Sequence, residues 1–354
     1  MSDELQRLAD SIRAAAAARS PLRIRGGGTK DFYGQALAGD LLDTRGYAGI
    51  VDYDPTELYA TVRAGTPLAA LEAALGERGQ MLAFEPPRFA PGGTVGGAVA
   101  SGLAGPRRQA AGGVRDFVLG VRMLDGRGDD LFFGGQVMKN VAGYDVSRLM
   151  AGAMGTLGLI LEVTLKVLPR PAAEATLRLE MPEDRALETL NRWGGKPLPV
   201  SASAWSGGEL TVRLSGAAAA VRAARGKLGG EAMDADAAAR FWEGIRDHRD
   251  PFFAGDEPPW RISVPSTAAA LPLPGDQMIE WGGALRWLRT QADARLVRDA
   301  ASKAGGHATL FRGGDKSVGV FHPLAAAVAR LHRNLKAELD PAGILNRGRM
   351  YADF

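Results

Sequence analysis

Apolar residues recur with a helical period and then with a strand period along the first 65 residues. From 3 to 19, Leu5, Leu8 and Ile12 share one face of a helix. Residues 21–25 form a short apolar run, and residues 58–65 alternate apolar with polar side chains. We therefore expect a helix followed by two strands in this part of the chain.

A second helix follows the strand at 58–65. Leu68, Leu71 and Leu75 repeat at helical spacing, which predicts a buried stripe. The order Thr66-Pro67 predicts that Thr66 is the N-cap and that Pro67 is the first helical residue. Gly79 is typical of a helix end, so the N-terminal third alternates helices with strands.

Glycine dominates the next part of the sequence, since 17 of the 68 residues from 91 to 158 are glycine. Valine, leucine and alanine are interleaved throughout this part, unlike in a flexible linker. The pattern predicts short strands and tight turns that lie against something flat. Residues 158–169 then alternate as a strand and stop at Pro169.

The composition changes near the segment "LPRPAAEA", where we expect a domain boundary. Strands are predicted at 210–216 and 261–266, and the tail forms an amphipathic helix that ends at Asp340-Pro341. No internal repeat interrupts this order. The expected α+β architecture has three parts, which are a first domain at 1–171, a second domain at 172–305 and a returning C-terminal segment at 306–354.

Composition excludes several kinds of site. The sequence has no cysteine, which excludes disulfides, thiolate-bound zinc and iron–sulfur clusters held by this chain. Its four histidines show no HExxH spacing, so no metal site is predicted. A net charge of +3 without runs of like charge argues against nucleic acid as the main partner.

No stretch of the sequence approaches the roughly 18 apolar residues of a membrane span. The start of the chain is amphipathic and lacks the apolar block of a signal peptide. We expect a cytoplasmic protein that meets membranes only through its partners.

Two glycine-rich stretches are candidates for binding chemistry. The run Arg25-Gly26-Gly27-Gly28-Thr29-Lys30 follows a strand, and backbone N–H groups in such a turn can converge on an anion such as a pyrophosphate. The stretch "PGGTVGGAVASGLAG" at 91–105 exposes backbone that can stack closely against a ring or a sugar–phosphate chain. Plain structural turns remain the alternative for both. Neither a phosphate loop ending in Gly-Lys-Ser/Thr nor a G-x-G-x-x-G loop opening a helix is present.

Four ordered motifs between residues 25 and 165 resemble the FAD-binding domain shared by vanillyl-alcohol oxidase, the para-cresol methylhydroxylase flavoprotein and D-lactate dehydrogenase-type enzymes. The first is the run from Arg25 to Lys30, and the second is "TVGGAVA" from Thr94. The third runs from Gly112 to Gly120, and the fourth is "GAMGTLGLILEVTL" from Gly152. The tail "DPAGILNRGRM" resembles that family's C-terminal motif, whose Asn and basic residue lie near the flavin; here Arg347 replaces the expected proline.

Within that family the chain resembles the smaller, E-type FAD-binding subunits of bacterial glycolate oxidase along its whole length. The segments "KNVAGYDVSRLMAG" and "PPWRISVP" carry this narrower resemblance. It implies that 1–171 is an FAD-binding domain, that 172–305 is a substrate or cap domain and that 306–354 returns to the flavin site. It implies FAD as the cofactor, and the absence of cysteine and of a histidine in the first loop implies non-covalent binding. The implied FAD-binding residues are Arg25, Gly26, Gly27, Gly28, Thr29, Lys30, Pro91, Gly92, Gly93, Thr94, Gly96, Gly97, Ser101, Gly113, Asp116, Gly155, Thr156, Gly158, Leu159, Ile160, Asn346 and Arg349.

Oxidation of a 2-hydroxy acid needs a cation for the carboxylate and a base for the hydroxyl proton. Arg261 is the candidate cation, because its strand alternation separates it from Trp260 and Ile262. His322 and His307 are the candidate bases. A salt bridge for Arg261 and structural roles for the histidines are the alternatives. The larger subunits of that family carry a His-rich segment for substrate or metal, and this sequence has none.

The resemblance implies a subunit of a glycolate oxidase complex that oxidises glycolate to glyoxylate. Its implied partners are a larger homologous FAD-binding subunit and an iron–sulfur subunit, because this chain has no cysteine to hold a cluster. Two alternatives stay open. One is a stand-alone FAD-dependent 2-hydroxy-acid dehydrogenase, and the other is a flavin-binding structural or regulatory subunit without turnover.

Overall fold

The computed structural model describes residues 3–135 and 145–354. These fold into two compact units. Unit 1 comprises Met1–Leu103, Gly113–Pro169 and Pro323–Phe354, and unit 2 comprises Ala104–Gly112 and Arg170–His322. The role of unit 2 as a substrate or cap domain stays a prediction.

A five-stranded antiparallel sheet forms the centre of unit 1, with strand order β3-β4-β8-β6-β7. Val163 of β8 pairs with Val62 of β4 on one side and with Val121 of β6 on the other. Central strand β8 is buried on both faces, which explains its nearly continuous apolar sequence. The strands are β3 Ile50–Asp54, β4 Tyr59–Arg63, β6 Val118–Leu124, β7 Asp130–Gly134 and β8 Leu159–Lys166.

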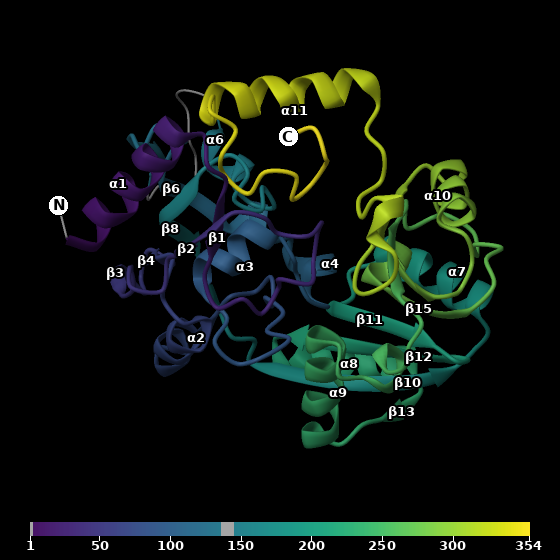
Figure 1. Cartoon of the computed structure of the whole chain (residues 1–354). Coiled ribbons are helices and arrows are strands. Elements are labelled where there is room, and N and C mark those ends of the chain that lie inside the picture. Colours follow the sequence, from purple (N-terminus) through teal and green to yellow (C-terminus); the bar gives the residue numbers. More distant parts are fainter. Residues whose placement is uncertain (1–2, 136–144) are drawn as a thin grey trace. The chain divides into compact units, whose positions relative to one another are not determined.

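A smaller parallel pair carries the first glycine loop. Strand β1, Leu22–Arg25, pairs with β2, Asp40–Asp43, and helix α1, Asp3–Ala18, packs against the pair. The C-terminal segment returns to the same strand, where Leu345 bridges to Leu22 (Figure 1). This connection joins both ends of the chain in one core and fixes the position of the loop after β1.

Short elements complete unit 1. Helix α2, Leu68–Glu77, begins later than the sequence predicts, because the Thr66 hydroxyl accepts from the Gly49 amide at 2.8 Å and is not available as a cap. The prediction that Thr66 is the N-cap is therefore wrong. The remaining elements are β5 Gln80–Met81, α3 Val95–Ser101, α5 Val114–Phe117, α6 Val146–Leu149, β9 Leu168–Pro169 and α11 Ala326–Leu339.

Unit 2 is built on an eight-stranded antiparallel sheet of order β13-β10-β12-β11-β15-β16-β14-β17. Its strands are β10 Ala173–Glu180, β11 Val200–Ser206, β12 Glu209–Gly216, β13 Glu231–Ala232, β14 Pro259–Ser263, β15 Asp276–Glu280, β16 Leu285–Arg289 and β17 His307–Leu310. Its helices are α4 Arg108–Ala111, α7 Glu183–Gly194, α8 Ala218–Leu228, α9 Ala235–Asp247 and α10 Ala294–Lys303, with single 3-10 turns at Pro251–Phe253, Trp281–Gly283 and Lys316–Val318.

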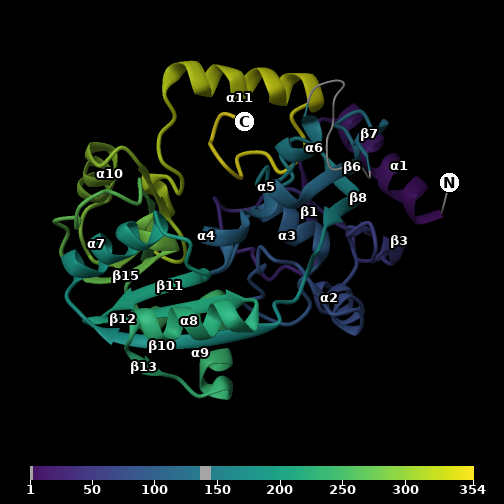
Figure 2. The ribbon, with the colours of Figure 1, turned by 180° about the vertical axis from the view of Figure 1, so that it is seen from behind.

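Helices cover the apolar face of this sheet. Helix α8 lies along β10 and β12, where Val221 and Ala224 pack against Leu210, Val212 and Leu214 (Figure 2). Helix α10 covers the other end of the same face in a second cluster. The opposite face carries more polar side chains, which include those of the candidate catalytic strand β14.

The elements predicted from periodicity are confirmed at 3–19, 21–25, 58–65, 210–216 and in the tail helix, within one or two residues of α1, β1, β4, β12 and α11. The strand predicted at 261–266 is shifted, because β14 ends at Ser263, before Pro265. In its described residues the glycine-rich part from 91 to 158 contains four short helices as well as strands, so its prediction as strands and turns is wrong in part. The start of "KNVAGYDVSRLMAG", up to residue 144, lies outside the described residues.

Candidate functional site

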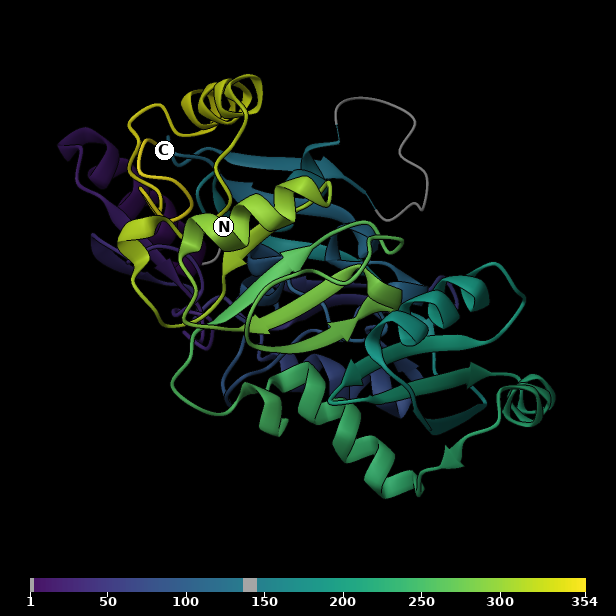
Figure 3. The ribbon, with the colours of Figure 1, turned by 90° about the vertical axis from the view of Figure 1, so that its right-hand side faces the viewer.

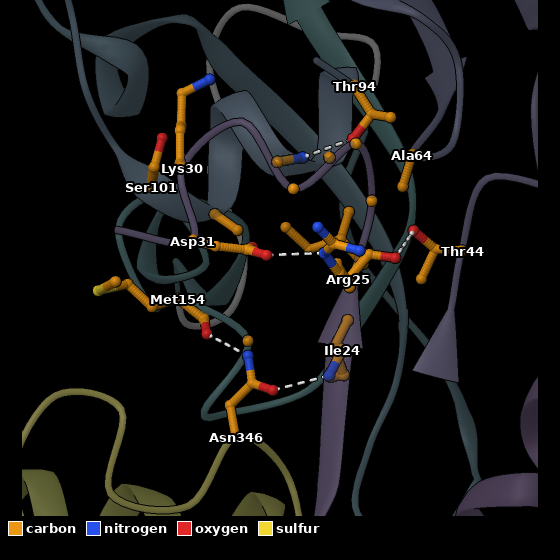
Figure 4. A pocket seen from close by; sticks show the side chains of 18 of the residues that line it. Ile24, Arg25, Lys30, Asp31, Thr44, Ala64, Thr94, Ser101, Met154 and Asn346 are labelled. Atoms are coloured by element: carbon orange, nitrogen blue, oxygen red, sulfur yellow. Dashed lines mark hydrogen bonds and ion pairs between the residues drawn. The ribbon is translucent and has the colours of Figure 1, made fainter. Parts of the chain in front are cut away.

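A pocket in unit 1 lies where four segments distant in sequence come together (Figure 4). They are the loop after β1, the start of α3, the loop before β8 and the C-terminal return. The sequence-predicted residues that line it are Arg25, Gly26, Gly27, Gly28, Thr29, Lys30, Thr94, Gly96, Gly97, Ser101, Gly155, Gly158, Ile160, Asn346 and Arg349.

Close packing explains why the first loop needs glycine. A Cβ atom on Gly27 would overlap the carbonyl oxygen of Gly92, and one on Gly26 would overlap the Thr94 hydroxyl. Gly28 has a φ of +70°, a left-handed conformation that glycine adopts without strain. The first two glycines therefore let the loop after β1 lie directly against the loop before α3, and both loops border the pocket.

The first loop also presents unused backbone donors. Among the residues that the structure describes, the amide N–H groups of Gly26, Gly27, Gly28 and Thr29 donate to no protein acceptor. At the start of α3, by contrast, the amide of Gly96 donates to Ala64 O and that of Gly97 to Thr94 Oγ1. Successive free N–H groups in a glycine turn form a site for an anion such as a phosphate. The anion-binding capacity of this pocket therefore lies in the first loop.

The side-chain charges at this loop are partly offset. Arg25 Nε donates to Asp31 Oδ2 at 2.7 Å, and both side chains are about 40% exposed. Lys30 lies over the ring of Phe89, with its Nζ 5.7 Å from the ring centroid. An exposed ion pair of this kind contributes little to stability. The backbone donors, rather than Arg25, thus dominate the local preference for an anion.

Asn346 and Arg349 line the pocket but use their polar atoms on the protein backbone. Asn346 accepts from Ile24 N at 2.8 Å and donates to Met154 O at 2.6 Å. The Arg349 guanidinium donates to the carbonyl oxygens of Lys30, Asp31 and Gln35. Burial lowers the pKa of Arg349 to about 10. Both side chains therefore hold the walls of the pocket in place.

Some predicted residues lie beside the pocket without lining it. The Asp116 carboxylate accepts from the Gly113 amide at 2.8 Å and so caps α5. The others outside the lining are Pro91, Gly92, Gly93, Gly113, Thr156 and Leu159. Gly92 and Gly93 act indirectly, because they form the surface against which the first loop packs.

The sequence analysis missed several residues of the lining, namely Ile24, Asp31, Tyr33, Leu37, Thr44, Ala64, Ala100 and Met154. Most of them lie in irregular segments or on strands, where alternation predicts which side chains are buried but not which ones line a pocket. The sequence offered one indication for Ala64: it is a small residue directly after β4, and its small size lets Gly96 approach closely.

The three candidate catalytic residues all belong to unit 2, and the structure brings them to one end of its sheet. In the pairing of β14 with β17, Arg261 lies opposite Thr309, and Ser263 lies opposite His307. His322 Nδ1 accepts from the Ala308 amide at 3.3 Å. Desolvation lowers the pKa of His307, and the neighbouring Arg261 and His322 lower it further.

The guanidinium of Arg261 lies 5.2 Å from the ring centroid of Trp281. Within residues 3–135 and 145–354 no acidic side chain lies within ion-pair distance of it. The salt bridge considered as an alternative is therefore not formed by the described residues. An unpaired guanidinium beside an indole suits a carboxylate ligand.

His248 in unit 2 is a titratable group that the sequence analysis did not single out. It ends α9 with φ +56°, stacks on Phe253 at 3.8 Å between ring centroids and meets the edge of Trp287. Burial lowers the pKa of His248 well below its ordinary value, and Arg312 and Arg261 add to this effect.

This environment predicts an acid-dependent loss of stability. Below about pH 6.5 His248 binds a proton in the unfolded chain but not in the folded chain. The free energy of unfolding is therefore highest above that pH, and it falls by at most about 1.4 kcal/mol per pH unit below it. We expect the Tm of His248→Asn, whose side chain does not titrate and tolerates the backbone conformation, to depend less on pH between about 5 and 7 than that of the native chain. Parallel slopes in thermal melts of the two proteins would contradict this assignment.

No group of three or more His, Cys, Asp or Glu residues is placed to hold a metal ion in the described part of the chain. None of the described helices is both long and apolar enough to cross a lipid bilayer.

Comparison with known proteins identifies the family. Residues 3–131 match the family described as "FAD binding domain". The glycolate oxidase subunit GlcE of Escherichia coli (strain K12) is 49% identical over 351 residues, which cover 99% of this chain and 98% of that protein. The chain belongs to the GlcE family.

Other relatives share part of the GlcE-type chain or its fold. The glycolate oxidase subunit GlcD of Bacillus subtilis (strain 168) is 31% identical over 184 residues, which cover 50% of this chain and 37% of that protein. The crystal structure of p-cresol methylhydroxylase with substrate bound matches at a TM-score of 0.72 and 15% identity, over 99% of this chain and 87% of that chain. Alkyldihydroxyacetonephosphate synthase matches at a TM-score of 0.68 and 15% sequence identity, over 96% of this chain and 75% of that chain. These structures share the predicted α+β fold.

The pocket of this GlcE-type chain fits the cofactor of its family. Unused amide donors on the first loop suit a pyrophosphate, and the apolar wall made by residues such as Leu37, Ala100 and Ile160 suits a ring system. The chain carries an FAD-binding domain, and FAD is its cofactor.

Proposed function

We propose that this chain is the FAD-binding subunit of a glycolate oxidase complex that oxidises glycolate to glyoxylate. The observation that carries the proposal is the 49% identity to GlcE along nearly the whole of both chains. GlcE is named as a subunit of glycolate oxidase, so we expect this chain to work with other subunits. Because the sequence contains no cysteine, an iron–sulfur cluster that receives the electrons has to be held by a partner.

In the proposed reaction the substrate loses two electrons and two protons. When bound, FAD supplies the acceptor for the hydride from the hydroxyl-bearing carbon. The amides of Gly26 to Thr29 hold the pyrophosphate, while Arg349 and Asn346 keep that loop and the loop before β8 in position. The cofactor is held without a covalent bond, because no cysteine is present and Thr29 and Lys30 occupy the turn.

In unit 2, Arg261 binds the substrate carboxylate and His307 accepts the hydroxyl proton. His307 is the better base of the two histidines, because Nδ1 of His322 already accepts from the Ala308 amide. The lowered pKa of His307 keeps its ring neutral, and therefore able to accept a proton, at neutral pH. Two observations support these roles. No acidic side chain of the described residues pairs with Arg261, and the pairing of β14 with β17 brings Arg261 and His307 near each other.

A test of the whole proposal mixes the purified, FAD-loaded chain with glycolate in the absence of oxygen. Loss of the yellow flavin absorbance supports catalysis by this chain. Persistence of the colour supports the second candidate, a flavin-binding subunit without turnover of its own, which is favoured by the lack of a His-rich segment in this sequence. A chain that stays colourless with excess FAD would overturn both.

The Arg261→Ala variant tests the carboxylate site. We expect the KM for glycolate in the assembled complex to rise at least about 10-fold, the effect of losing roughly one charge-assisted hydrogen bond. FAD content should not change. Arg295→Ala, which removes an arginine side chain that is 89% exposed on α10, is the matched control. An unchanged KM in Arg261→Ala would remove Arg261 from the site.

A further inference from the structure

Trp281 in unit 2 combines an uncommon backbone conformation with two cationic neighbours. It begins the 3-10 turn Trp281–Gly283 between β15 and β16, two of the light-green strands in Figure 3. Its φ of +52° is a left-handed conformation, which a bulky side chain rarely adopts. The guanidiniums of Arg108 and Arg261 lie 4.4 and 5.2 Å from the centroid of its indole ring. Backbone conformations of this kind cluster at functional sites, so Trp281 is a candidate for a role in one.

Hydrogen bonds fix this turn and its indole ring. Trp281 is 5% exposed, and its Nε1 donates to Gly105 O at 3.1 Å. The amide of Gly282 donates to Ser203 Oγ at 3.0 Å. The fully buried Arg286 donates from Nε to the last carbonyl oxygen of the turn at 2.7 Å. The ring therefore has one fixed place in unit 2, as a group that orients another side chain must have.

The Arg261 guanidinium contacts this ring and forms no hydrogen bond or ion pair with any residue that the structure describes. An aromatic face attracts the positive charge of a guanidinium without neutralising it. A carboxylate partner from the protein, by contrast, would occupy the N–H groups that a substrate carboxylate needs. An indole is thus suited to hold Arg261 while leaving its donors available to a ligand.

We propose that Trp281 is a positioning residue, which holds the Arg261 guanidinium in the orientation that binds the carboxylate of the 2-hydroxy acid. This inference rests on the proposed function, because it needs the carboxylate role of Arg261. Arg108 of α4 brings a second positive charge to the same ring, which increases the local preference for an anion. Trp281 acts through Arg261 and has no contact of its own with the substrate.

Trp242 of α9 supplies a matched control for the loss of a buried indole. It is also 5% exposed, its Nε1 donates to Thr176 Oγ1 at 2.9 Å, and Arg213 lies 5.1 Å from its ring centroid. Arg213, however, donates from Nε to Ser201 Oγ at 3.1 Å. It lies on β12, which is separated from β14 by β11, β15 and β16 in the sheet. Replacement of Trp242 therefore removes a similar side chain without a contact to Arg261.

The test measures glycolate oxidation by the assembled complex. We expect Trp281→Leu to raise KM about 5-fold and to change kcat less than about 2-fold, because the lost interaction binds the substrate before and during the reaction. Trp281→Phe keeps an aromatic face and should recover most of the native KM, while Trp242→Leu should leave KM unchanged. In the Arg261→Ala background Trp281→Leu should have almost no further effect on KM, because it then has no guanidinium to position.

A nearly isosteric replacement covers the case in which Trp281→Leu does not fold. Tetrafluorotryptophan keeps the shape of the side chain, but its fluorine atoms withdraw electrons from the ring face and weaken the attraction for a cation. The KM for glycolate should rise in Trp281→tetrafluorotryptophan and stay native in Trp242→tetrafluorotryptophan. The FAD content and Tm of each variant report whether both units are intact.

A native KM in both Trp281→Leu and Trp281→tetrafluorotryptophan would overturn the inference. An effect of Trp281→Leu that is as large in Arg261→Ala as in the native chain would also overturn it, since Trp281 would then act independently of Arg261. Either result leaves the carboxylate role of Arg261 intact if Arg261→Ala alone raises KM. If Arg261→Ala leaves KM unchanged, that part of the proposed function fails, and this inference fails with it.

Discussion

The Gly27→Ala variant is expected to purify without bound FAD. The new methyl group would overlap the carbonyl oxygen of Gly92, which is backbone and cannot move aside as a flexible side chain can. The loop after β1 would have to shift away from the loop before α3, and the amides of Gly26 to Thr29, which have no acceptor among the described residues, would move with it. We expect the Kd for FAD to rise at least about 100-fold, or roughly 2.7 kcal/mol.

Fluorescence titration with FAD measures this effect, and circular dichroism reports the fold. Gly226→Ala is the matched control, because its Cβ would meet nothing within 4 Å on helix α8 of unit 2. That variant should retain FAD and gain about 0.5–1 kcal/mol of stability from better helix propensity. Native FAD affinity in Gly27→Ala would show that the first loop does not hold the cofactor.

The segments around the pocket could be found in the sequence because each one has a local signature. The loop after β1 follows an apolar strand and contains three adjacent glycines, and the loop before β8 joins small residues to a strand of nearly continuous apolar character. Each of these patterns is contained within a few neighbouring residues, so it can be recognised from the periodicity of the sequence. The helix α11 and its end at Asp340 are predictable for the same reason.

Contacts that depend on the folded path of the chain could not be predicted in this way. Thr66 has the sequence context of an N-cap, but a turn at Gly49 uses its hydroxyl, so a tertiary contact overrides the local preference. Arg25 looks like a free cation in the sequence, but the irregular loop turns so that Asp31 neutralises part of its charge. Neither turn has a periodic pattern that would reveal it.

The candidate catalytic group shows the same limit more strongly. Strand alternation correctly separated Arg261 from Trp260 and Ile262, since β14 buries alternate residues. His307 lies near Arg261 because β14 pairs with β17, and these strands are about 45 residues apart in the sequence. This pairing depends on the strand order of the sheet, which no local sequence pattern encodes. His248 was missed because its environment is made of aromatic residues from three separate segments.

Replacement of Lys336 by methionine is expected to cause the largest loss of stability among the variants considered. The Lys336 ammonium is buried and donates to Thr156 O at 2.8 Å, to Leu345 O at 2.7 Å and to Asp340 Oδ2 at 2.6 Å. Burial lowers the pKa of Lys336, and the Asp340 carboxylate opposes that shift. Methionine fills similar space but leaves the carboxylate without its cation.

The free energy of unfolding should fall by about 3–5 kcal/mol in Lys336→Met, which is the range for breaking a buried ion pair. This loss corresponds to a fall in Tm of roughly 5–10 °C. FAD affinity should fall as well, since Thr156 lies between Gly155 and Gly158 in the loop that lines the pocket. Thermal unfolding and FAD titration measure both effects. In the double variant Lys336→Met/Asp340→Asn no charge is left buried, so part of the stability should return. If the double variant is no more stable than the single one, the loss of stability comes from packing rather than from the unpaired Asp340 carboxylate. The charge of Lys336 would then not be what holds the C-terminal segment to the cofactor loop.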